Sequence, residues 1–500
     1  MGLLLRNKQK KEEWIKILYS DLWELYDRKE VDILPALWLS YFNLRPELKQ
    51  CFAYCSLFPK DYHFRKGEMV LLWMAEGLLQ STNRKRVEEV GEEYFEDLIS
   101  MSFFQPSNND KMESTFLMHD LIHDLAIFVS GEFCYMMNNI NKCSHKVRHF
   151  SLSQDWKGAY EAKEFEELFK AKCLRTILWH WRQGSINDLL KIEQLDKLFP
   201  SLRVLSIEDN RITKLPDSIG NLKYLRYLKL DCGSIKEIPN TICKLYNLKI
   251  LLLEGCGMVT TLPTDIGNLI KLQHLSVPMK GLVEIPLQLS KLQNLQTLNS
   301  FVVGKNKDSA ASIKLLKEFQ HLHGSLSIKG LQNVSSLEEV SAAALNNFKF
   351  LSHLSLEWDY HHYPKVDELH IESDELNIQR EVLSALQPHS NLKELTIEKY
   401  KGNSFPNWMG DHSCLSNLVS LKMVNCRNCN FLPSLGQLPS LKYLWIRDCG
   451  VIEEVVFPDY EKSCVCADYL KLVVFETPPP AEKKGEVERY ESHVKERTSR

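Results

Sequence analysis

From Leu202 the sequence reads LRVLSIEDNRITKLPDSIGNL, and from Leu225 it returns to the same pattern as LRYLKLDCGSIKEIPNTICKL. Two more copies, LKILLLEGCGMVTTLPTDIGNL and LQHLSVPMKGLVEIPLQLSKL, begin at Leu248 and Leu272, and LQTLNSF begins a fifth at Leu295. The leading leucines are 23, 23, 24 and 23 residues apart. A fixed period of this length indicates stacked repeats that bury one another's apolar side chains. The stretch therefore predicts a solenoid.

Each copy supplies one short strand and a return segment, which is the plan of a leucine-rich repeat. Similar leucine patterns begin at Leu351, Leu392, Leu418 and Leu441. Residues 301–350 interrupt the regular period, and the polar residues 359–375, with His361-His362, suggest an inserted loop. We predict an α/β solenoid of leucine-rich repeats over residues 147–476. Residues 477–500 are almost purely charged after three prolines, and we expect this tail to be disordered.

Composition places limits on the function. The 500 residues suggest two or three domains, and the net charge of −3 gives no global attraction to nucleic acid or to anionic membranes. No apolar run approaches the roughly 18 residues of a membrane span. We expect a soluble, cytoplasmic chain whose 14 cysteines stay reduced.

Several cysteines have a structural explanation. Cys256, Cys426 and Cys449 each follow the last apolar strand position by three residues, Asn210 shares that offset, and Cys232 comes one residue earlier. In the repeat consensus a small donor at this position points inward and bonds the backbone of the turn. Cys426-x-x-Cys429 then reads as part of a turn. Zinc is disfavoured there because no second ligand pair has suitable spacing.

The N-terminal residues predict helices. Residues 1–30 show apolar side chains at helical spacing, and residues 31–146 predict three or four helices closed by a hairpin with a polar tip. Pro35, Pro46 and Pro59 suit helix starts or turns, and Gly77 suits a helix end. This order of elements predicts a winged helix.

These residues carry a family resemblance. The order CFAYCSLFPKDY, LLWMAEGLL, LMHDLIHDLA and then leucine-rich repeats resembles plant intracellular immune receptors of the coiled-coil NB-ARC leucine-rich-repeat class. Residues 1–30 resemble the end of the first ARC helical subdomain, and residues 31–146 the ARC2-like winged helix. The family carries a P-loop domain upstream, but no G-x-x-x-x-G-K-[ST] occurs here. The resemblance implies an N-terminally truncated receptor, or a homologue without the ATPase core.

Met118-His119-Asp120 matches the MHD motif of that family. The resemblance implies that His119 reaches the β-phosphate of ADP and that Asp120 orients the motif or caps the following helix. Because the P-loop half of that pocket is missing, we expect no ADP or ATP to be held by this chain alone.

Other chemistries fit less well. His119 and His123 form H-D-x-x-H, but Asp is a methylene shorter than the general base of a zinc protease, and no third ligand is apparent. The basic cluster at 84–86 lies in an apparent loop, and the helix expected at 119–129 carries acids, so DNA binding is disfavoured. Without a Ser/His/Asp or Cys/His set, we predict no enzyme.

The outward position at the end of each strand forms the concave face of the solenoid. Glu208, Asp231 and Glu254 place three acids on adjacent strands, about 4.8 Å apart. This acidic row either receives a basic surface, from a partner protein or from the chain's own winged helix, or is an ordinary charged surface. Near the end of the solenoid, Tyr443, Trp445 and Arg447 share one strand face and are residue types typical of interface anchors.

The resemblance implies a protein of plant innate immunity. In this reading the repeats recognise a pathogen effector or a guarded host protein, and the winged helix restrains or relays the signal. Protein partners, including the chain's own or a partner's NB-ARC and coiled-coil domains, are expected. Two alternatives stay open: an ADP/ATP switch completed by missing sequence or another chain, and a general leucine-rich-repeat scaffold.

Overall fold

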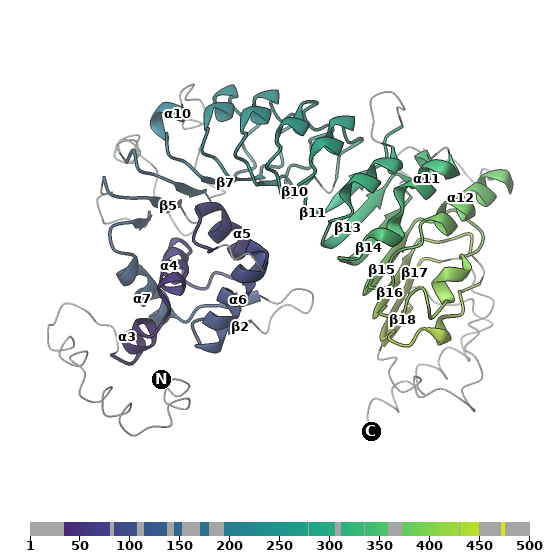
Figure 1. Cartoon of the computed structure of the whole chain (residues 1–500), viewed down its shortest axis with the longest axis horizontal. Helices are drawn as coiled ribbons and strands as arrows, with labels where there is room; N and C mark the ends of the chain where they lie inside the picture. The colour runs from purple at the N-terminus through teal and green to yellow at the C-terminus, as the bar shows by residue number, and fades with distance from the viewer. Residues whose placement is uncertain are drawn as a thin grey trace, which may run out of the picture. The chain divides into compact units, whose positions relative to one another are not determined.

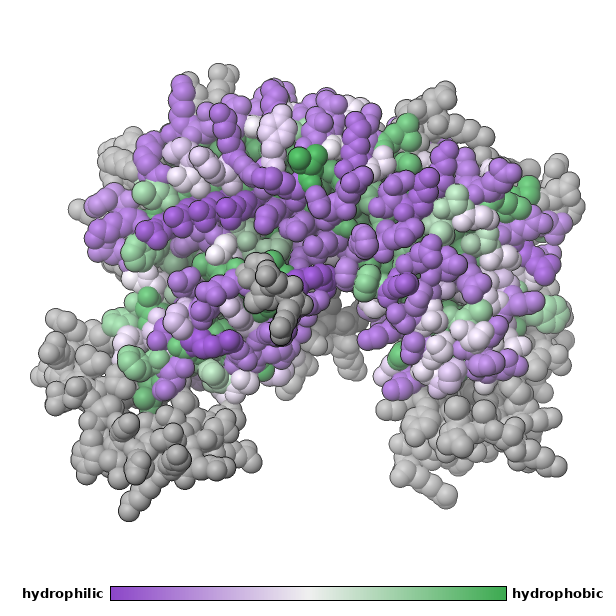
Figure 2. All heavy atoms as spheres, viewed as in Figure 1, coloured by the Kyte–Doolittle hydropathy of each residue, from purple (hydrophilic) through white to green (hydrophobic). Residues whose placement is uncertain are grey.

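A computed structural model (Figure 1) describes residues 35–80, 85–107, 115–137, 145–152, 171–179, 195–278, 280–305, 312–334, 336–358, 373–429, 431–449 and 472–475. The chain divides into two compact units, Met1–Cys256 and Gly257–Arg500. The predictions for residues 1–30, for His361-His362 and for the charged tail lie outside the described residues. Among the described helices, none has the length and apolar character that crossing a membrane requires. The face seen in Figure 2 is mostly hydrophilic.

Among the described residues of unit 1, α-helices build the N-terminal domain: α3 (Pro35–Phe42), α4 (Pro46–Tyr54), α5 (Lys66–Glu76), α6 (Val87–Ser100) and α7 (Asp120–Ser130), with the short 3-10 helix η2 (Cys55–Leu57) after α4. Pro35 and Pro46 stand at the first helical positions, where a missing amide hydrogen leaves no bond unmade. Gly77 ends α5 in the left-handed region, with φ of 87°, and its N–H bonds the Trp73 carbonyl at 3.0 Å. The predicted helix starts and stops are confirmed here.

A three-stranded antiparallel sheet completes the winged helix. Strand β3 (Thr115–Leu117) pairs with β2 (Gln105–Pro106) and with β1 (Phe64–Arg65). The predicted hairpin is β2–β3, and its tip at 108–114 lies outside the described residues. β1 has only two residues and shows no period that sequence reasoning could detect.

Parallel strands of unit 1 begin the solenoid: β4 (Cys134–Met136), β5 (His149–Leu152), β6 (Thr176–Trp179), β7 (Val204–Glu208), β8 (Tyr227–Asp231) and β9 (Ile250–Leu252). The return segments carry α10 (Leu195–Leu198), η3 (Asp217–Asn221) and η4 (Asn240–Lys244). Equivalent repeat positions face each other, as Ile207 and Leu230 do. We predicted that the repeats start at residue 147, but β4, which precedes that residue, already pairs with β5. Its three residues follow α7 closely and carry no leucine pattern.

The winged helix and the first repeats share one apolar core. Trp73 and Phe95 are fully buried in the same cluster as Val204 and Tyr227 of the repeat strands. The Tyr54 hydroxyl lies 3.3 Å from that of Thr176 on β6. Burial of large aromatic side chains from both domains fixes α4 and α5 on the strands.

The inward cysteines behave as expected from the repeat consensus. The thiols of Cys232 and Cys256 donate to the carbonyls of Ile207 and Leu230 in the preceding repeat, at 3.7 and 3.3 Å. Burial raises the pKa of Cys232 to about 12 and that of Cys256 to about 11, so both stay protonated donors.

The same position in unit 2 holds further thiols. Cys426 and Cys449 donate to Ile397 and Met423 carbonyls at 3.7 and 3.6 Å, and Cys429 donates to the Gly402 carbonyl at 3.1 Å. Each of these sulfurs therefore contacts main chain in the preceding repeat, as a turn residue would.

The assignment of Asn210 to this inward position is wrong by one residue. Asp209 is only 1% exposed, whereas Asn210 is exposed and accepts the Gly233 N–H at 2.9 Å. The strand register explains the difference, because Ile207 faces Leu230 and Asp209 therefore matches Cys232.

Unit 2 continues the parallel repeats. Its strands are β10 (His274–Ser276), β11 (Thr297–Leu298), β12 (Ser300–Val302), β13 (Gly324–Lys329), β14 (Leu351–Glu357), β15 (Glu394–Glu398), β16 (Ser420–Val424), β17 (Tyr443–Arg447) and β18 (Leu472–Phe475). The return segments hold η5 (Ile266–Asn268), η6 (Leu287–Lys291), η7 (Ile313–Phe319), η8 (Leu331–Asn333), α11 (Leu337–Ala343), η9 (Leu345–Asn347), α12 (Ser373–Ala385), η10 (Asn407–Gly410) and η11 (Leu435–Gln437). Figure 1 shows α11 and α12 on one side of the strands β13–β17.

One side chain joins two stretches of this ladder. β10 pairs with β11, and β12 pairs with β13, so the ladder changes strands at Asn299. The Asn299 amide accepts the Val277 N–H at 2.8 Å and donates to the Val277 carbonyl at 3.0 Å. Its own carbonyl accepts the Ser327 N–H at 2.9 Å. The side chain thus replaces main-chain pairing where the strand breaks.

Residues 301–350 interrupt the 23-residue period but stay in the sheet. Phe301 pairs with Ile328, which pairs with Leu356, so these repeats are 27 and 28 residues long. The longer repeats accommodate α11, which the 23-residue period could not anticipate. One prediction for unit 2 needs correction: the loop expected at 359–375 is too long, because α12 starts at Ser373, while 359–372 lies outside the described residues.

Candidate functional site

The motif Met118-His119-Asp120 stands at the start of α7. Met118 is buried, whereas His119 and Asp120 are exposed. His119 is the N-cap residue, and its Nδ1 accepts the Leu121 N–H at 3.2 Å. The prediction that Asp120 caps this helix is therefore wrong. Because Nδ1 accepts, the neutral imidazole carries its proton on Nε2 and can donate it outward.

The charges around His119 do not fit a phosphate by themselves. Asp120 and Asp124 lie on the same helix, and Lys60 pairs with Asp124 at 2.8 Å. Both Asp124 and Asp120 help to raise the pKa of Lys60, so its charge is already balanced by acids. One imidazole N–H beside two carboxylates fits only as one contact of a phosphate pocket that other residues would complete.

His123 has a structural role. It is 1% exposed, and its Nε2 donates to the Phe58 carbonyl at 2.7 Å. Within the described ranges, no group of three His, Cys, Asp or Glu side chains could hold a metal ion.

A row of arginines fixes α5 on the repeats. Arg175, Arg203 and Arg226, which we call the arginine set, each precede the start of one of the adjacent strands β6, β7 and β8. Arg203 donates to the Glu76 carbonyl at 2.8 Å, and Arg226 lies 3.4 Å from the Ala75 carbonyl. Free carbonyls and the negative end of the helix dipole make a helix C-terminus attractive to cations. Arg203 and Arg226 therefore cap α5 from the solenoid.

Glu76 adds a buried carboxylate to this contact. It is 3% exposed, and its Oε1 lies 3.5 Å from Arg175 and 3.6 Å from Arg203. Burial raises the pKa of Glu76 to about 6, although the arginines oppose that rise. A Cβ at Gly77 would stand 3.4 Å from the Arg226 guanidinium, an ordinary contact, so the left-handed backbone rather than the arginines calls for glycine here.

Lys229 forms a second contact between α5 and the strands. Its ammonium lies 2.8 Å from Glu68 of α5 and 2.9 Å from Glu208 of β7. Burial alone lowers the pKa of Lys229, but Glu68, Tyr227 and Glu208 together outweigh it and hold it raised. One ammonium between two carboxylates links the winged helix to the concave face.

This contact corrects the prediction for the acidic row. The winged helix brings an acid, Glu68, to the row, and the balancing cation comes from the solenoid itself. Asp231 faces Glu208 in the strand register and is half-buried, and Glu254 is exposed. Contacts of these acids with a partner protein stay a prediction.

Tyr443, Trp445 and Arg447 alternate along β17, so their side chains share one face. Tyr443 is 45% exposed, Trp445 is half-buried and Arg447 is exposed beside Asp448. The structure thus brings the three together as expected, and their role in binding stays a prediction.

Sequence reasoning missed a charged cluster on the same side of the sheet. Glu357 of β14 pairs with Lys399 at 3.0 Å and lies 3.7 Å from Lys329 of β13. Lys399 lies just beyond β15 with φ of 56°. Such a conformation has no signal in the leucine pattern. The arginine set was missed as well, although each member follows a leading leucine.

Family models match three segments of the chain. The winged helix domain of disease resistance proteins matches residues 57–126, a leucine-rich repeat model matches 200–258, and the R13L1/DRL21 leucine-rich repeats match 313–449. These segments are the winged helix and the two regions of repeats described above.

Relatives match most of the chain. A putative disease resistance protein of Arabidopsis thaliana is 44% identical over 90% of this chain and 31% of its own length. The putative disease resistance RPP13-like protein 1 of Arabidopsis thaliana is 42% identical over 89% of this chain and 42% of its own length. The chain spans less than half the length of these relatives. A leucine-rich-repeat protein of Leptospira interrogans, 19% identical with a TM-score of 0.38, covers 61% of this chain and 85% of its own, a likeness too low to add to the assignment.

The fold and the site define a winged helix docked on leucine-rich repeats. This is the class of winged-helix leucine-rich-repeat proteins. Over about nine tenths of its length the chain is similar to plant disease resistance proteins, with RPP13-like and RGA proteins among these relatives.

Proposed function

We propose that this chain is the recognition and regulatory part of a cytoplasmic plant immunity protein, without enzymatic activity of its own. Its repeats bind a pathogen effector or a guarded host protein, and its winged helix is restrained by the first repeats. The contact of the arginine set with the C-terminus of α5 carries the proposal, because it ties the two domains together through polar groups.

The domains share an apolar core, and the polar contacts at its edge suit a restraint that a partner can loosen. The side chains of Arg175, Arg203 and Lys229 are 35%, 27% and 23% exposed, so water can replace their partners when the contact opens. A partner that binds the repeats better in the open state shifts the population toward it by its difference in affinity. Glu208 and Lys229 lie both on the concave face and in the contact, so a ligand on that face would compete with docking.

Nucleotide dependence follows from the same proposal. His119 presents one N–H donor, so ADP or ATP would require a phosphate pocket supplied by sequence beyond this chain or by another chain. The sequence has no P-loop, and Asp120 and Asp124 disfavour a free anion at α7. The same acids argue against α7 as a DNA-reading helix.

The test is co-expression in leaf tissue. The full chain is expressed with the N-terminal part of the RPP13-like relative that it does not span, with association and cell death as readouts. We expect wild type to associate and keep the tissue silent, and a variant with all members of the arginine set changed to glutamine to lose that restraint. No association, or equal behaviour of both forms, would favour the general scaffold.

A further inference from the structure

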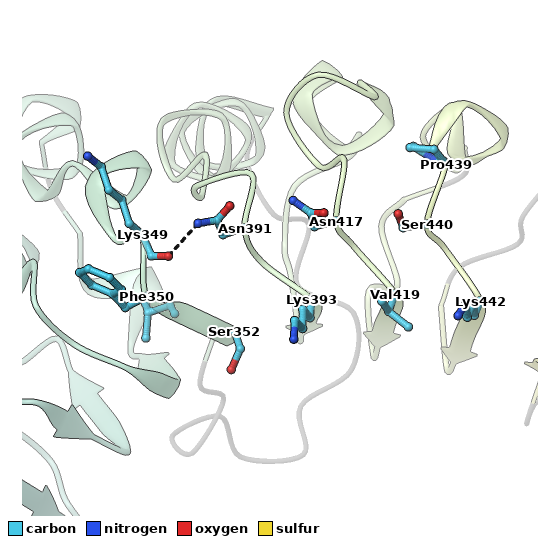
Figure 3. A pocket seen from close by; sticks show the side chains of 11 residues that line it. Lys349, Phe350, Ser352, Asn391, Lys393, Asn417, Val419, Pro439, Ser440 and Lys442 are labelled. Carbon is cyan, nitrogen blue, oxygen red and sulfur yellow. Dashed lines mark hydrogen bonds between the residues drawn. The ribbon is translucent and has the colours of Figure 1, made fainter. Parts of the chain in front are cut away.

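A groove crosses one edge of the later repeats in unit 2 (Figure 3). It passes the starts of β14, β15, β16 and β17 and has a volume of about 800 Å³. Its principal lining side chains are Lys349, Phe350, Lys393, Val419, Pro439 and Lys442. Figure 3 shows Lys393, Val419 and Lys442 in one row beside the strand starts, and Asn391, Asn417 and Ser440 in a second row along the turns.

The second row is occupied with internal hydrogen bonds. Asn391 donates to the Lys349 carbonyl at 3.0 Å, and Asn417 donates to the Ser390 carbonyl at 3.1 Å. Ser440 continues the pattern by donating to the preceding turn at 2.8 Å. These bonds hold successive turns at constant spacing, so the floor of the groove is preorganised.

Three lysines that line the groove carry positive charge, Lys393 and Lys442 in the first row and Lys349 beside Phe350. Lys349, Lys393 and Lys442 are exposed, and none of them forms an ion pair with a residue in the described ranges. Lys393 and Lys442 precede β15 and β17, two strands apart, which is about 10 Å at 4.8 Å per strand. Three residues of an extended peptide span about the same distance.

An aromatic side chain closes one end of the groove. Phe350 is 52% exposed, and its ring stacks on His323 with centroids 4.6 Å apart and planes 13° from parallel. The stack holds Phe350 in place as an apolar wall next to Lys349.

We propose that this groove binds an extended acidic segment of a partner protein. Two carboxylates of the bound segment, three residues apart, face Lys393 and Lys442, and one end of that segment continues toward Lys349 and Phe350. Protein is favoured over nucleic acid because Glu394 begins β15 directly after Lys393, and the whole chain has a net charge of −3. The proposal rests on the recognition of a protein by the repeats and adds a second surface to their concave face.

The experiment measures fluorescence anisotropy of a labelled nine-residue peptide on the full chain. The peptide has glutamate at every third position in a serine and glycine background. We expect saturable binding that weakens as salt rises. The combined variant Lys349→Gln, Lys393→Gln and Lys442→Gln should lose about tenfold in affinity, as expected for three exposed ion pairs. The matched variant Lys280→Gln, Lys291→Gln and Lys314→Gln changes exposed lysines outside the groove and should stay within about twofold.

Three outcomes would overturn the proposal. They are absence of binding by wild type, equal affinity of the two variants, and tighter groove-dependent binding of duplex DNA or of phosphatidylserine vesicles than of the peptide. If the groove variant unfolds, as judged by thermal unfolding, the single change Lys442→Gln and the salt dependence of wild type take its place. Cell death does not enter this assay, so a failed peptide test refutes the groove and leaves the immune function to its own experiment.

Discussion

Changing Arg203 to methionine should detach the end of α5 from the solenoid. The variant loses the bond to the Glu76 carbonyl at 2.8 Å and the contact with the Glu76 carboxylate at 3.6 Å. Glu76 stays buried and keeps Arg175 as its remaining close cation at 3.5 Å. The hydrophobic stem of methionine fills most of the space, so the change tests charge more than packing.

The expected loss of stability follows from how deeply the Arg203 and Glu76 side chains are buried. Removing one partner of a buried ion pair costs about 3–5 kcal/mol, and a hydrogen bond to a charged group contributes about 1.5–3 kcal/mol. The Arg203 side chain is 27% exposed and that of Glu76 is 2% exposed, so water compensates on the arginine side only. We expect a loss of about 2–3 kcal/mol in the local stability of α5.

Hydrogen exchange of the α5 amides measures this local stability directly. The expected loss corresponds to a rise in exchange of about 30- to 150-fold in the last turn of α5. A matched control is Arg45→Met, because Arg45 pairs with Asp97 on the surface and should cost about 0.5 kcal/mol.

A second variant separates the effect of the lost hydrogen bond from that of the unpaired Glu76 carboxylate. Adding Glu76→Gln to Arg203→Met neutralises the carboxylate and should recover about 1 kcal/mol. Exchange in Arg203→Met that stays within about threefold of wild type would refute the docking role of Arg203. A double variant less stable than the single one would refute the assignment of the cost to Glu76.

Three further changes test other features. The pKa of Glu76 rises from 4.5 to about 6 on folding, so its contribution to stability is present below pH 4.5 and is lost as the pH rises through 6. This dependence amounts to at most about 2 kcal/mol. Glu76→Gln should remove it, as measured by urea unfolding at pH 4.5 to 7.5. Gly220→Ala places a Cβ against the Thr241 carbonyl and should cost about 1–3 kcal/mol in thermal unfolding, whereas Gly257→Ala meets open space and should not. Asn299→Leu leaves the N–H and the carbonyl of Val277, just after β10, unpaired and should cost about 3 kcal/mol, seen as faster exchange of the Val277 amide; an unchanged rate would contradict the bridging role.

The leucine period predicted the repeat strands because burial inside a stack depends on neighbours of the same kind. Ile207 and Leu230 face each other as the period requires, and Cys256 bonds the preceding repeat as the consensus implies. Helix limits such as Gly77 were predictable for a similar reason, since they depend on local backbone conformation. Such features follow from short segments of sequence.

The docking of α5 could not be predicted in this way. Arg203 and Glu76 are 127 positions apart, and the period says nothing about a domain that lies against the stack. The sequence does show a Leu-Arg pair at Arg175, Arg203 and Arg226, but an arginine on a strand is equally compatible with solvent. For the same reason one alternative for the acidic row was wrong: α5 brings the acid Glu68 rather than a basic surface, and Lys229 of the strands balances both Glu68 and Glu208.

The amide of Asn299 has a mechanical consequence. In a linear array each neighbouring pair of repeats bears load separately, and rupture starts at the pair with the fewest bonds. β10 and β11 pair through main chain, but beyond β10 the link from Val277 to the next repeat runs through one side chain, so tension applied along unit 2 should weaken the array there first. In a pulling trace, β10–β11 and β12–β18 would then unfold in separate events on either side of Asn299.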